Sequence, residues 1–286
     1  MVELPLVVGV DGSEAALRAV DWAADAAVRH GMPLRLLHAS TEWTDDWAEE
    51  EPRPDDVVAG AAERARQHAP DVRLTTDVLA EEPADALAHA GRNAFVLVVG
   101  ARGRGGIAGL LLGSVSLSVA GRADCPVVVV RGGDTARRGE HGRIVLGVGD
   151  LPEDGVDAPA ARFAFREATA RHCELHAVRA WRRPVLQAQR HPLLQGNPSR
   201  AREREALEYL DGALRATARE HSGIDLRMRA VEGPARAVLL EESRGADLLV
   251  IGAHRRRGHL GLQMGMVDHA LLHHAACPVA LVPEHI

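Results

Sequence analysis

Lysine is absent from this 286-residue chain, whose 34 basic residues are all arginine. That absence excludes the P-loop motif G-x4-G-K-[ST], in which a lysine reaches the phosphates. Aromatic residues are also scarce, at 3% of the chain, whereas hydrophobic residues make up 46%. The cores must therefore be built from alanine, leucine and valine, and the length suggests two domains.

The chain also has few cysteines, no long apolar run and no basic block. Its three cysteines, Cys125, Cys173 and Cys277, leave one unpaired and form no C-x-x-C pair, which excludes a disulfide scaffold and favours a reducing cytosol. Residues 1–5 lead into a strand without a secretory h-region, so we expect a soluble cytoplasmic protein without a membrane partner. The net charge of −6 argues against a nucleic-acid partner.

A glycine-rich stretch from Gly100 to Ser114, G-A-R-G-R-G-G-I-A-G-L-L-L-G-S, carries the main functional signal. It follows an apolar run at 95–99, short enough for a buried strand, and precedes a segment at 114–123 with helical spacing. A strand that enters a glycine-rich loop and then a helix can cradle phosphate, because backbone N–H groups and the helix dipole face the anion. A tight strand-to-helix turn that binds nothing is the alternative.

The glycine spacing differs from the dinucleotide-binding fingerprint. That fingerprint, G-x-G-x-x-G, follows the first strand of a βαβ unit and has an acidic residue roughly 20 residues later. Here Gly100, Gly103, Gly113 and Ser114 give G-x2-G-x9-G-S after a late strand, and no such acid is evident. The motif therefore predicts a different kind of phosphate-binding loop.

The first half alternates between strand and helix patterns. Short apolar runs predict strands at 6–10, 34–39, 72–78, 95–99 and 125–130. Helical spacing predicts helices at 13–30, 57–68, 83–92 and 114–123. Ser13 is the expected N-cap of the first helix, Gly31 its stop signal, and Pro83 the first residue of the third; the acidic segment 41–56 is predicted to be a loop. Such alternation predicts a parallel sheet with helices on both faces.

The pattern returns after a polar linker at 133–142, so the chain is a duplication with domains at 1–132 and 143–286. Landmark residues recur at similar spacings. The spacings are 138 residues from Gly9 to Gly147 and from His38 to His176, 151 from Pro83 to Pro234, and 152 from Gly100 to Gly252. The spacing grows by about a dozen residues after the second strand, which predicts a longer loop at 182–199.

In these features the chain resembles the universal stress protein family. The resemblance is carried by G-V-D-G-S after the first strand, L-H-A on the second, G-x2-G-x9-G-S, and C-P-V at the last strand, and it covers nearly the whole chain. It implies two tandem Rossmann-like α/β domains, each with a five-stranded parallel sheet in the order 3-2-1-4-5 and helices on both faces. It also implies ATP binding at the carboxyl ends of the strands, where open α/β sheets bind ligands.

The resemblance assigns roles to residues of the first half. Gly9 would let the nucleotide approach the first strand, Asp11 would accept hydrogen bonds from the nucleoside, and Ala39 would line the adenine pocket. The residues expected around the phosphates are Gly100, Arg102, Gly103, Arg104, Gly105 and Gly106, with a backbone N–H and a hydroxyl from Gly113 and Ser114. The expected ligand is ATP, with or without Mg²⁺. Alternatively, Asp11 could cap the first helix, and the two arginines could be ordinary surface residues.

The second half departs from this motif. Arg255 replaces a glycine, Met266 replaces the serine, and Gly149 stands where Asp11 stands, with Asp150 one residue later. The arginine side chain fills space that glycine leaves for phosphate, although it could contact phosphate in another way, and methionine cannot donate a hydrogen bond. We therefore expect one ATP per chain, bound in the first half.

Histidines and cysteines of the second half give weaker signals. His269 and His273 are four residues apart on an expected helix, a spacing that can bind a metal. Neither H-E-x-x-H nor a cysteine pair accompanies them, so we interpret them as solvent-facing and predict no metal site. Cys125 and Cys277 begin expected strands and are predicted to be small core residues.

Two classes of function fit the motif. The first is a stress-response or regulatory protein, in which bound ATP changes conformation or the choice of a protein partner. The second is an enzyme, either an ATP hydrolase or a nucleotidyl-transferring ligase. The sequence shows no catalytic triad, carboxylate pair or metal cage, so we predict ATP binding with little or no turnover.

Each half ends in a valine-rich strand, at 127–130 and 279–282. In the order 3-2-1-4-5 both strands lie at a sheet edge, and an exposed apolar edge is an aggregation hazard. The matching strand of the other half is the simplest cover, which predicts an internal pseudo-two-fold pair, with or without a further homodimer. A linker of about ten residues permits this, since an extended chain spans roughly 3.3 Å per residue.

Overall fold

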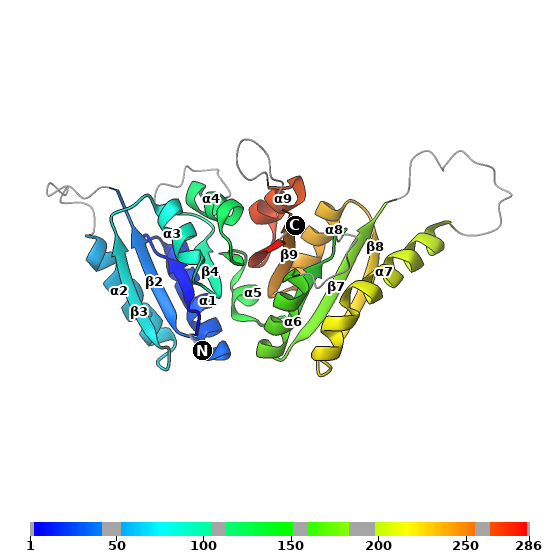
Figure 1. The fold of residues 1–286 in the computed structure, drawn as a ribbon, viewed down its shortest axis with the longest axis horizontal. Coiled ribbons are helices and arrows are strands. Elements are labelled where there is room, and N and C mark those ends of the chain that lie inside the picture. Colours follow the sequence, from blue (N-terminus) through cyan, green and yellow to red (C-terminus); the bar gives the residue numbers. More distant parts are fainter. Residues whose placement is uncertain are drawn as a thin grey trace.

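The computed structural model describes residues 3–41, 53–103, 112–150, 159–182, 198–254 and 264–284, and strands and helices alternate through both halves (Figure 1). The first half contains β1 (Leu6–Gly9), α1 (Glu14–His30), β2 (Leu34–Ala39), α2 (Pro54–His68), β3 (Leu74–Leu79), α3 (Pro83–Gly91), β4 (Val96–Gly100), α4 (Ser114–Arg122) and β5 (Val127–Val130). After α5 (Asp134–Arg138), the second half contains β6 (Arg143–Gly147), α6 (Pro159–Arg171), β7 (Glu174–Trp181), α7 (Pro198–Glu220), β8 (Leu226–Glu232), α8 (Ala235–Glu242), a 3-10 turn (Ser243–Gly245), β9 (Leu248–His254), α9 (Met266–His274) and β10 (Val279–Glu284).

The strands of both halves join in a single ten-stranded sheet. Its order is β3-β2-β1-β4-β5-β10-β9-β6-β7-β8, so each half has the predicted order 3-2-1-4-5. Strands within each half are parallel, whereas β5 and β10 pair antiparallel, with Val129 opposite Val279 and Val127 opposite Leu281. The predicted pairing of the two edge strands is therefore present, and the halves lie side by side in Figure 1.

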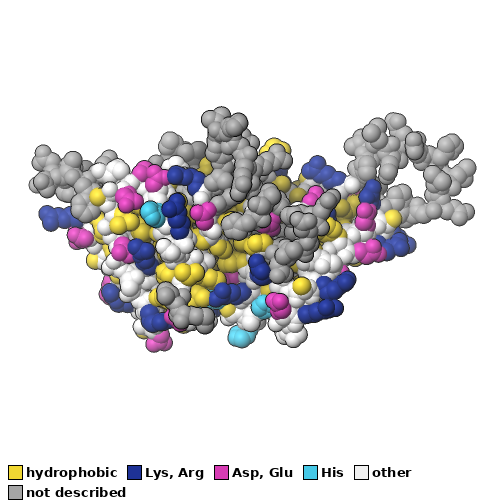
Figure 2. Space-filling view, viewed as in Figure 1, with side chains coloured by type: hydrophobic (Ala, Val, Ile, Leu, Met, Phe, Trp, Pro, Cys, Tyr) yellow, Lys and Arg dark blue, Asp and Glu magenta, His cyan; other side chains and the backbone are white. Residues whose placement is uncertain are grey.

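Helices cover both faces of the sheet, and each hydrophobic core runs across both halves. One core packs α1, α2, α6 and α7 against the sheet, and the other packs α3, α4, α8 and α9 against the opposite face. Both are built mostly from alanine, leucine and valine, as predicted, and Cys125 and Cys277 are buried among them. None of the described helices combines the length and apolar composition needed to cross a bilayer. On the face in Figure 2, arginines and acidic side chains are interspersed.

Capping explains the limits of the first helix. The Ser13 hydroxyl accepts a hydrogen bond from the Ala16 N–H at 3.1 Å, and Gly31 ends the helix with φ of 65°, as its αL position requires. α6 ends differently. His172 takes the corresponding position with φ of 51°, a conformation that favours glycine.

The strand register corrects one part of the predicted repeat. Leu6 pairs with Leu34, and its counterpart Ile144 pairs with Leu175. Leu175 therefore corresponds to Leu34 and Ala180 to Ala39, a spacing of 141 residues. The predicted match of the two Leu-His-Ala triplets was wrong. A triplet this short can recur by chance along a chain, whereas the backbone hydrogen bonds of paired strands fix one register.

Two connecting segments also differ from expectation. The added residues of the second half were expected in a loop, but α7 has 23 residues and α2 has 15, so much of the insertion lengthens a helix. The predicted linker is helical over Asp134–Arg138, and α2 begins at Pro54, inside the expected loop. Most of the two loops expected at 41–56 and 182–199, namely residues 42–52 and 183–197, lies outside the described residues.

A buried ion cluster joins α1 of the first half to α6 of the second. His30 Nε2 lies 2.7 Å from Glu167 Oε1, and Arg171 Nε lies 3.1 Å from Glu167 Oε2, with all three side chains at most 7% exposed. Burial alone would raise the pKa of Glu167, but hydrogen bonds and charges from His30 and Arg171 lower that pKa to about 2. Glu167 is therefore ionised at neutral pH and ties the halves together.

Candidate functional site

A pocket of about 420 Å³ opens at the carboxyl ends of β1 and β4. Its floor is formed by the ends of these strands and of β2, and its sides by the starts of α1, α3 and α4. The lining residues are Gly9, Val10, Asp11, Ala16, Leu37, Ala39, Pro83, Leu87, Val99, Gly100, Arg102, Gly103, Leu112, Gly113, Ser114, Val115 and Ser116. The pocket thus lies at the switch point of the first half, because β1 has β2 on one side and β4 on the other.

All the predicted site residues that the structure describes line this pocket. They are Gly9, Asp11, Ala39, Gly100, Arg102, Gly103, Gly113 and Ser114. The other three predictions, Arg104, Gly105 and Gly106, lie outside the described residues. Four separate segments of the chain therefore converge on one cavity.

Two of the glycines lie where an added side chain would make a close contact. A Cβ atom on Gly100 would lie 2.6 Å from the backbone carbonyl of Ala15 at the start of α1. A Cβ atom on Gly103 would lie 2.6 Å from Asp11 Oδ2. Side chains at either position would close the space between the β1 and β4 loops, so glycine keeps this cradle open.

Asp11 lines the pocket and also shapes the turn between β1 and α1. Its Oδ1 accepts a hydrogen bond from the Ser13 N–H at 2.9 Å, while Ser13, not Asp11, caps the helix. On the neighbouring strand, His38 Nδ1 lies 2.7 Å from the Val10 carbonyl oxygen and holds the same turn. The carboxylate therefore faces the cavity from a turn that is fixed on both sides.

The N-terminus of α4 faces the same cavity. Its N-cap is Gly113, so no side chain caps this end of the helix. The Gly113 N–H, which the resemblance assigns to phosphate, instead donates to the Ala101 carbonyl at 2.8 Å. The first-turn N–H groups that follow, beginning with Ser114, are the donors that an anion would meet.

Several lining residues were not predicted from the sequence. Leu37, Leu87 and Leu112 form an apolar wall, and each comes from a different segment. Ser116 is buried, and its hydroxyl donates to the Gly100 carbonyl at 2.7 Å, which ties α4 to β4. A serine two residues after Ser114 was the available signal for this contact, whereas the leucines resembled ordinary core residues.

One arginine lines this pocket and a second lies near the first. Arg102 lines the pocket and is exposed, so its position is compatible with both the pocket role and the surface role that were expected as alternatives. Arg131 follows β5, and burial, together with a smaller contribution from the charge of Arg102, lowers its pKa to about 10. Arg131 also donates to the Leu272 carbonyl of α9 and so connects the first half to the second.

The second half has a larger pocket, of about 650 Å³, in the corresponding place. Gly147, Gly252 and Gly265 line it at the positions of Gly9, Gly100 and Gly113. Its charged lining residues are Asp150, Arg179, Asp268 and Glu284, so carboxylates outnumber cations among the described lining residues. The two pockets thus share a location, but the described lining of the first has one acidic and one basic residue, Asp11 and Arg102, whereas acidic residues outnumber basic ones in the second.

The predicted pair of histidines lies on α9. The rings of His269 and His273 stack with centroids 4.3 Å apart, and His269 is exposed while His273 is partly buried. Burial, followed by the charges of His269, His274 and Arg131, lowers the pKa of His273. Within the described part of the chain, no group of three or more potential metal ligands comes together.

Comparisons with known proteins give one consistent result. The model of the universal stress protein family matches residues 5–131 and 141–283. A universal stress protein of Mycobacterium tuberculosis strain H37Rv is 32% identical over 296 residues, covering 98% of this chain and 97% of that protein. The crystal structure of a universal stress protein from Archaeoglobus fulgidus, 16% identical, covers both chains fully with a TM-score of 0.65. A shorter universal stress protein, solved in complex with cAMP, is 31% identical and covers 46% of this chain and 98% of its own, with a TM-score of 0.37.

Proposed function

Because the chain belongs to the universal stress protein family, we propose that its first half binds ATP in the pocket formed by β1, β4 and α4. The observation that carries this proposal is the convergence of the motif residues on one cavity, with an uncapped helix N-terminus beside a glycine cradle. Adenine would occupy the apolar side, beside Ala39 and Leu37. The phosphates would face α4 and Arg102.

The residues present also fit a magnesium ion that accompanies ATP. Mg²⁺ is usually bound by one or two carboxylates together with phosphate oxygens and water. Asp11 is the carboxylate among the described lining residues of this pocket and would be its protein ligand. The ion would neutralise phosphate charge when it is bound.

We propose a regulatory function based on occupancy, with little or no turnover. A hydrolase needs a base within reach of the attacking water. The acidic side chain of the described pocket, Asp11, already accepts the Ser13 N–H, and no histidine lines the pocket in the described part of the chain. Purified protein should hydrolyse ATP slowly or not at all, and rapid hydrolysis that Asp11→Asn abolishes would contradict this.

Calorimetric titration of ATP into Gly103→Val protein tests the site. The new side chain would collide with Asp11, so we expect affinity to fall by about tenfold or more. Gly121→Val is the matched control, because a Cβ atom at Gly121, on α4, meets nothing within 4 Å. Unchanged ATP affinity in folded Gly103→Val protein would refute the site, and mass spectrometry of ligand released from denatured protein would identify the nucleotide.

A further inference from the structure

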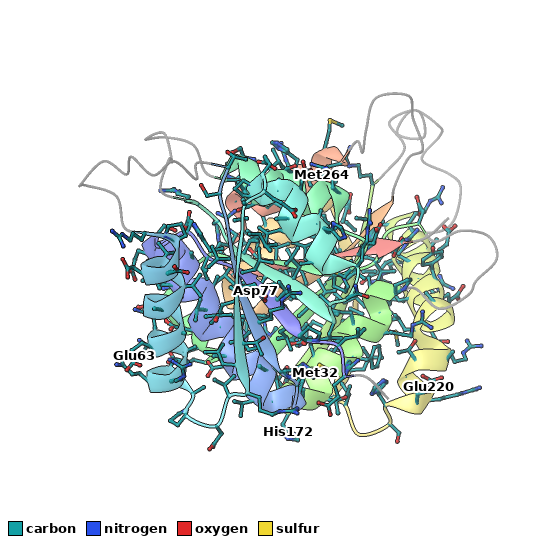
Figure 3. All side chains as sticks on the ribbon, turned by 60° about the vertical axis from the view of Figure 1, so that its left-hand side comes forward. Met32, Glu63, Asp77, His172, Glu220 and Met264 are labelled. Atoms are coloured by element: carbon teal, nitrogen blue, oxygen red, sulfur yellow. The ribbon has the colours of Figure 1, made fainter. Side chains whose placement is uncertain are left out.

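Two buried N–H donors lie together at the junction of α1 and α6. Trp22 of α1 is 2% exposed, and the Arg171 side chain of α6 is 7% exposed. The Arg171 guanidinium lies 5.2 Å from the centre of the Trp22 ring. In Figure 3, Met32 just after α1 and His172 just after α6 lie at the same end of the molecule, opposite Met264. Arg171, at the C-terminal end of α6, therefore reaches across to α1 of the other half.

Neither donor has an acceptor among the described residues. Trp22 Nε1 and Arg171 Nη2 are both buried there without a hydrogen-bond partner. Glu167 accepts from Arg171 Nε at 3.1 Å, and its other oxygen lies 2.7 Å from His30 Nε2. An indole or guanidinium N–H can only donate, and a buried donor without an acceptor is costly. The pair therefore points to a bound acceptor, which is either a water molecule or an anion.

The charges around the two donors favour an anion over water. Burial, and then the charge of Arg171, lower the pKa of Arg29 to about 10, because a second guanidinium lies nearby. Glu167 is the buried carboxylate that acts on both arginines. Asp25 also acts on Arg29, but its side chain is 38% exposed and pairs with His68 at 3.0 Å. Positive charge thus exceeds negative charge next to the two donors, and an anion there gains Coulomb attraction that a neutral water does not.

The number of donors indicates a small monovalent anion. Each further charge and each further oxygen of a buried ion would need a donor of its own. Two N–H groups would therefore leave sulfate or phosphate poorly satisfied, whereas a halide is a single acceptor atom. Because the guanidinium and the ring centre lie 5.2 Å apart, one such ion can contact both side chains. Chloride is the abundant halide of cells and buffers.

We propose that a chloride ion binds between Trp22 Nε1 and Arg171 Nη2. Both N–H groups would donate to it, and Arg29 would add attraction without a direct contact. Since the donors belong to α1 of the first half and α6 of the second, the bound ion would tie the two halves together. Chloride concentration would then set how firmly the halves are joined, because a ligand that binds only the folded chain stabilises it by mass action. The proposal does not rest on nucleotide binding.

Indole N–H signals in NMR spectra report on this site directly. The full chain has four tryptophans, and Trp22→Phe identifies the Trp22 signal by its loss. Isotope-labelled protein is held at constant ionic strength while sodium chloride replaces sodium gluconate. The Trp22 signal should shift to saturation with chloride. The signal of Trp181 on β7, whose Nε1 is also buried without an acceptor among the described residues, should stay in place.

Matched arginine variants test the second donor. Arg171→Lys keeps the positive charge and the long stem but removes the guanidinium N–H groups. The chloride concentration that half-saturates the Trp22 shift should therefore rise by about tenfold or more. Arg215→Lys, at an exposed arginine that pairs with Asp211 on α7, is the control and should leave half-saturation unchanged.

Urea unfolding provides a second test if Arg171→Lys does not fold. The wild-type midpoint should rise as chloride replaces gluconate at constant ionic strength. Trp22→Phe removes one donor while keeping an aromatic ring, so the rise should begin at about tenfold higher chloride concentration. Trp181→Phe is the matched control and should keep the wild-type dependence.

Three results would overturn the proposal. They are a Trp22 signal that stays in place as chloride replaces gluconate, an equal shift of the Trp22 and Trp181 signals, and half-saturation that Arg171→Lys leaves unchanged in folded protein. The first result would assign the two donors to a buried water instead.

Discussion

The two pockets of this chain differ in charge although they share a wall. Gly9 with Leu87 and Gly147 with Leu239 make the same close contact, so the fold preserves the slot in both halves. The helix end differs, with Ser116 in the first pocket and Asp268 in the second. Like charges about 4 Å apart cost roughly 4 kcal/mol at the effective dielectric constant near a protein surface. The two helix ends therefore present different groups to a ligand, a hydroxyl in the first half and a carboxylate in the second.

Removal of the acid from the ion cluster between α1 and α6 should have the largest effect on stability. Only the second half supplies an acid at this position. Ala26 of α1 stands where Glu167 stands on α6. Glu167→Ala leaves Arg171 buried without its counter-charge and His30 without its hydrogen-bond partner, so we expect the free energy of unfolding to fall by about 3–5 kcal/mol in urea titrations. Glu241→Ala, which breaks an exposed pair with Arg244, is the control and should cost less than about 1 kcal/mol.

The same residue predicts a pH dependence. The pKa of Glu167 is lowered to about 2, so its stabilisation is fully present above its unfolded pKa and is lost as pH falls through the folded pKa. Between pH 5 and pH 3 the wild-type chain should lose about 2 kcal/mol through this group, and Glu167→Gln should lose that much less. Identical losses in both proteins would show that the cluster does not set acid stability.

Equivalent glycines on β4 and β9 should tolerate substitution unequally. A methyl group on Gly100 meets the backbone of Ala15, which cannot move without displacing α1, so Gly100→Ala should cost about 2–3 kcal/mol. A methyl group on Gly252 meets the side chain of Glu284 rather than backbone, and a side chain can move more readily, so Gly252→Ala should cost less than Gly100→Ala. Urea midpoints of the two variants decide this, and equal costs would mean that the two strand ends are equally constrained.

Exchanging one residue between the pockets sharpens the electrostatic comparison. Ser116→Asp places the acid of the second pocket in the first, and we expect ATP affinity to fall by about tenfold or more. Ser116→Asn has a similar volume without the charge and should retain most of the affinity. Calorimetry that found the same loss for both variants would attribute the effect to the hydrogen bond with Gly100 instead.

The smallest expected effect concerns two corresponding helix ends. Gly31 and His172 both adopt positive φ, at 65° and 51°, but only glycine does so without steric cost. His172→Gly should stabilise the chain by about 0.5 kcal/mol, and Gly31→Ala should destabilise it by about 1 kcal/mol. Thermal unfolding of both variants checks the signs, and a destabilising His172→Gly would point to contacts of the imidazole.

Local patterns in the sequence determined the elements and the first pocket. Ser13 and Gly31 delimit α1 through short-range hydrogen bonds and a single backbone torsion, which depend on neighbours in the chain. The motif glycines converge because parallel strands bring their carboxyl ends to one edge of a sheet. The valine-rich ends of both halves, β5 and β10, predicted their own pairing because an apolar edge must be covered.

Only the tertiary structure decided features that depend on contacts between distant segments. The register of β7 places Ala180, and not Ala177, at the position equivalent to Ala39, because backbone pairing with β6 overrides a matching triplet. Glu284 reaches Gly252 because two strands that are far apart in sequence lie side by side. Glu167 meets His30 because β5 and β10 join the halves, and the hydrogen bonds and charges of His30 and Arg171 there lower the pKa of Glu167 although burial alone would raise it. Charge in a pocket and charge in a core are set by neighbours in space, which periodicity along the chain does not specify.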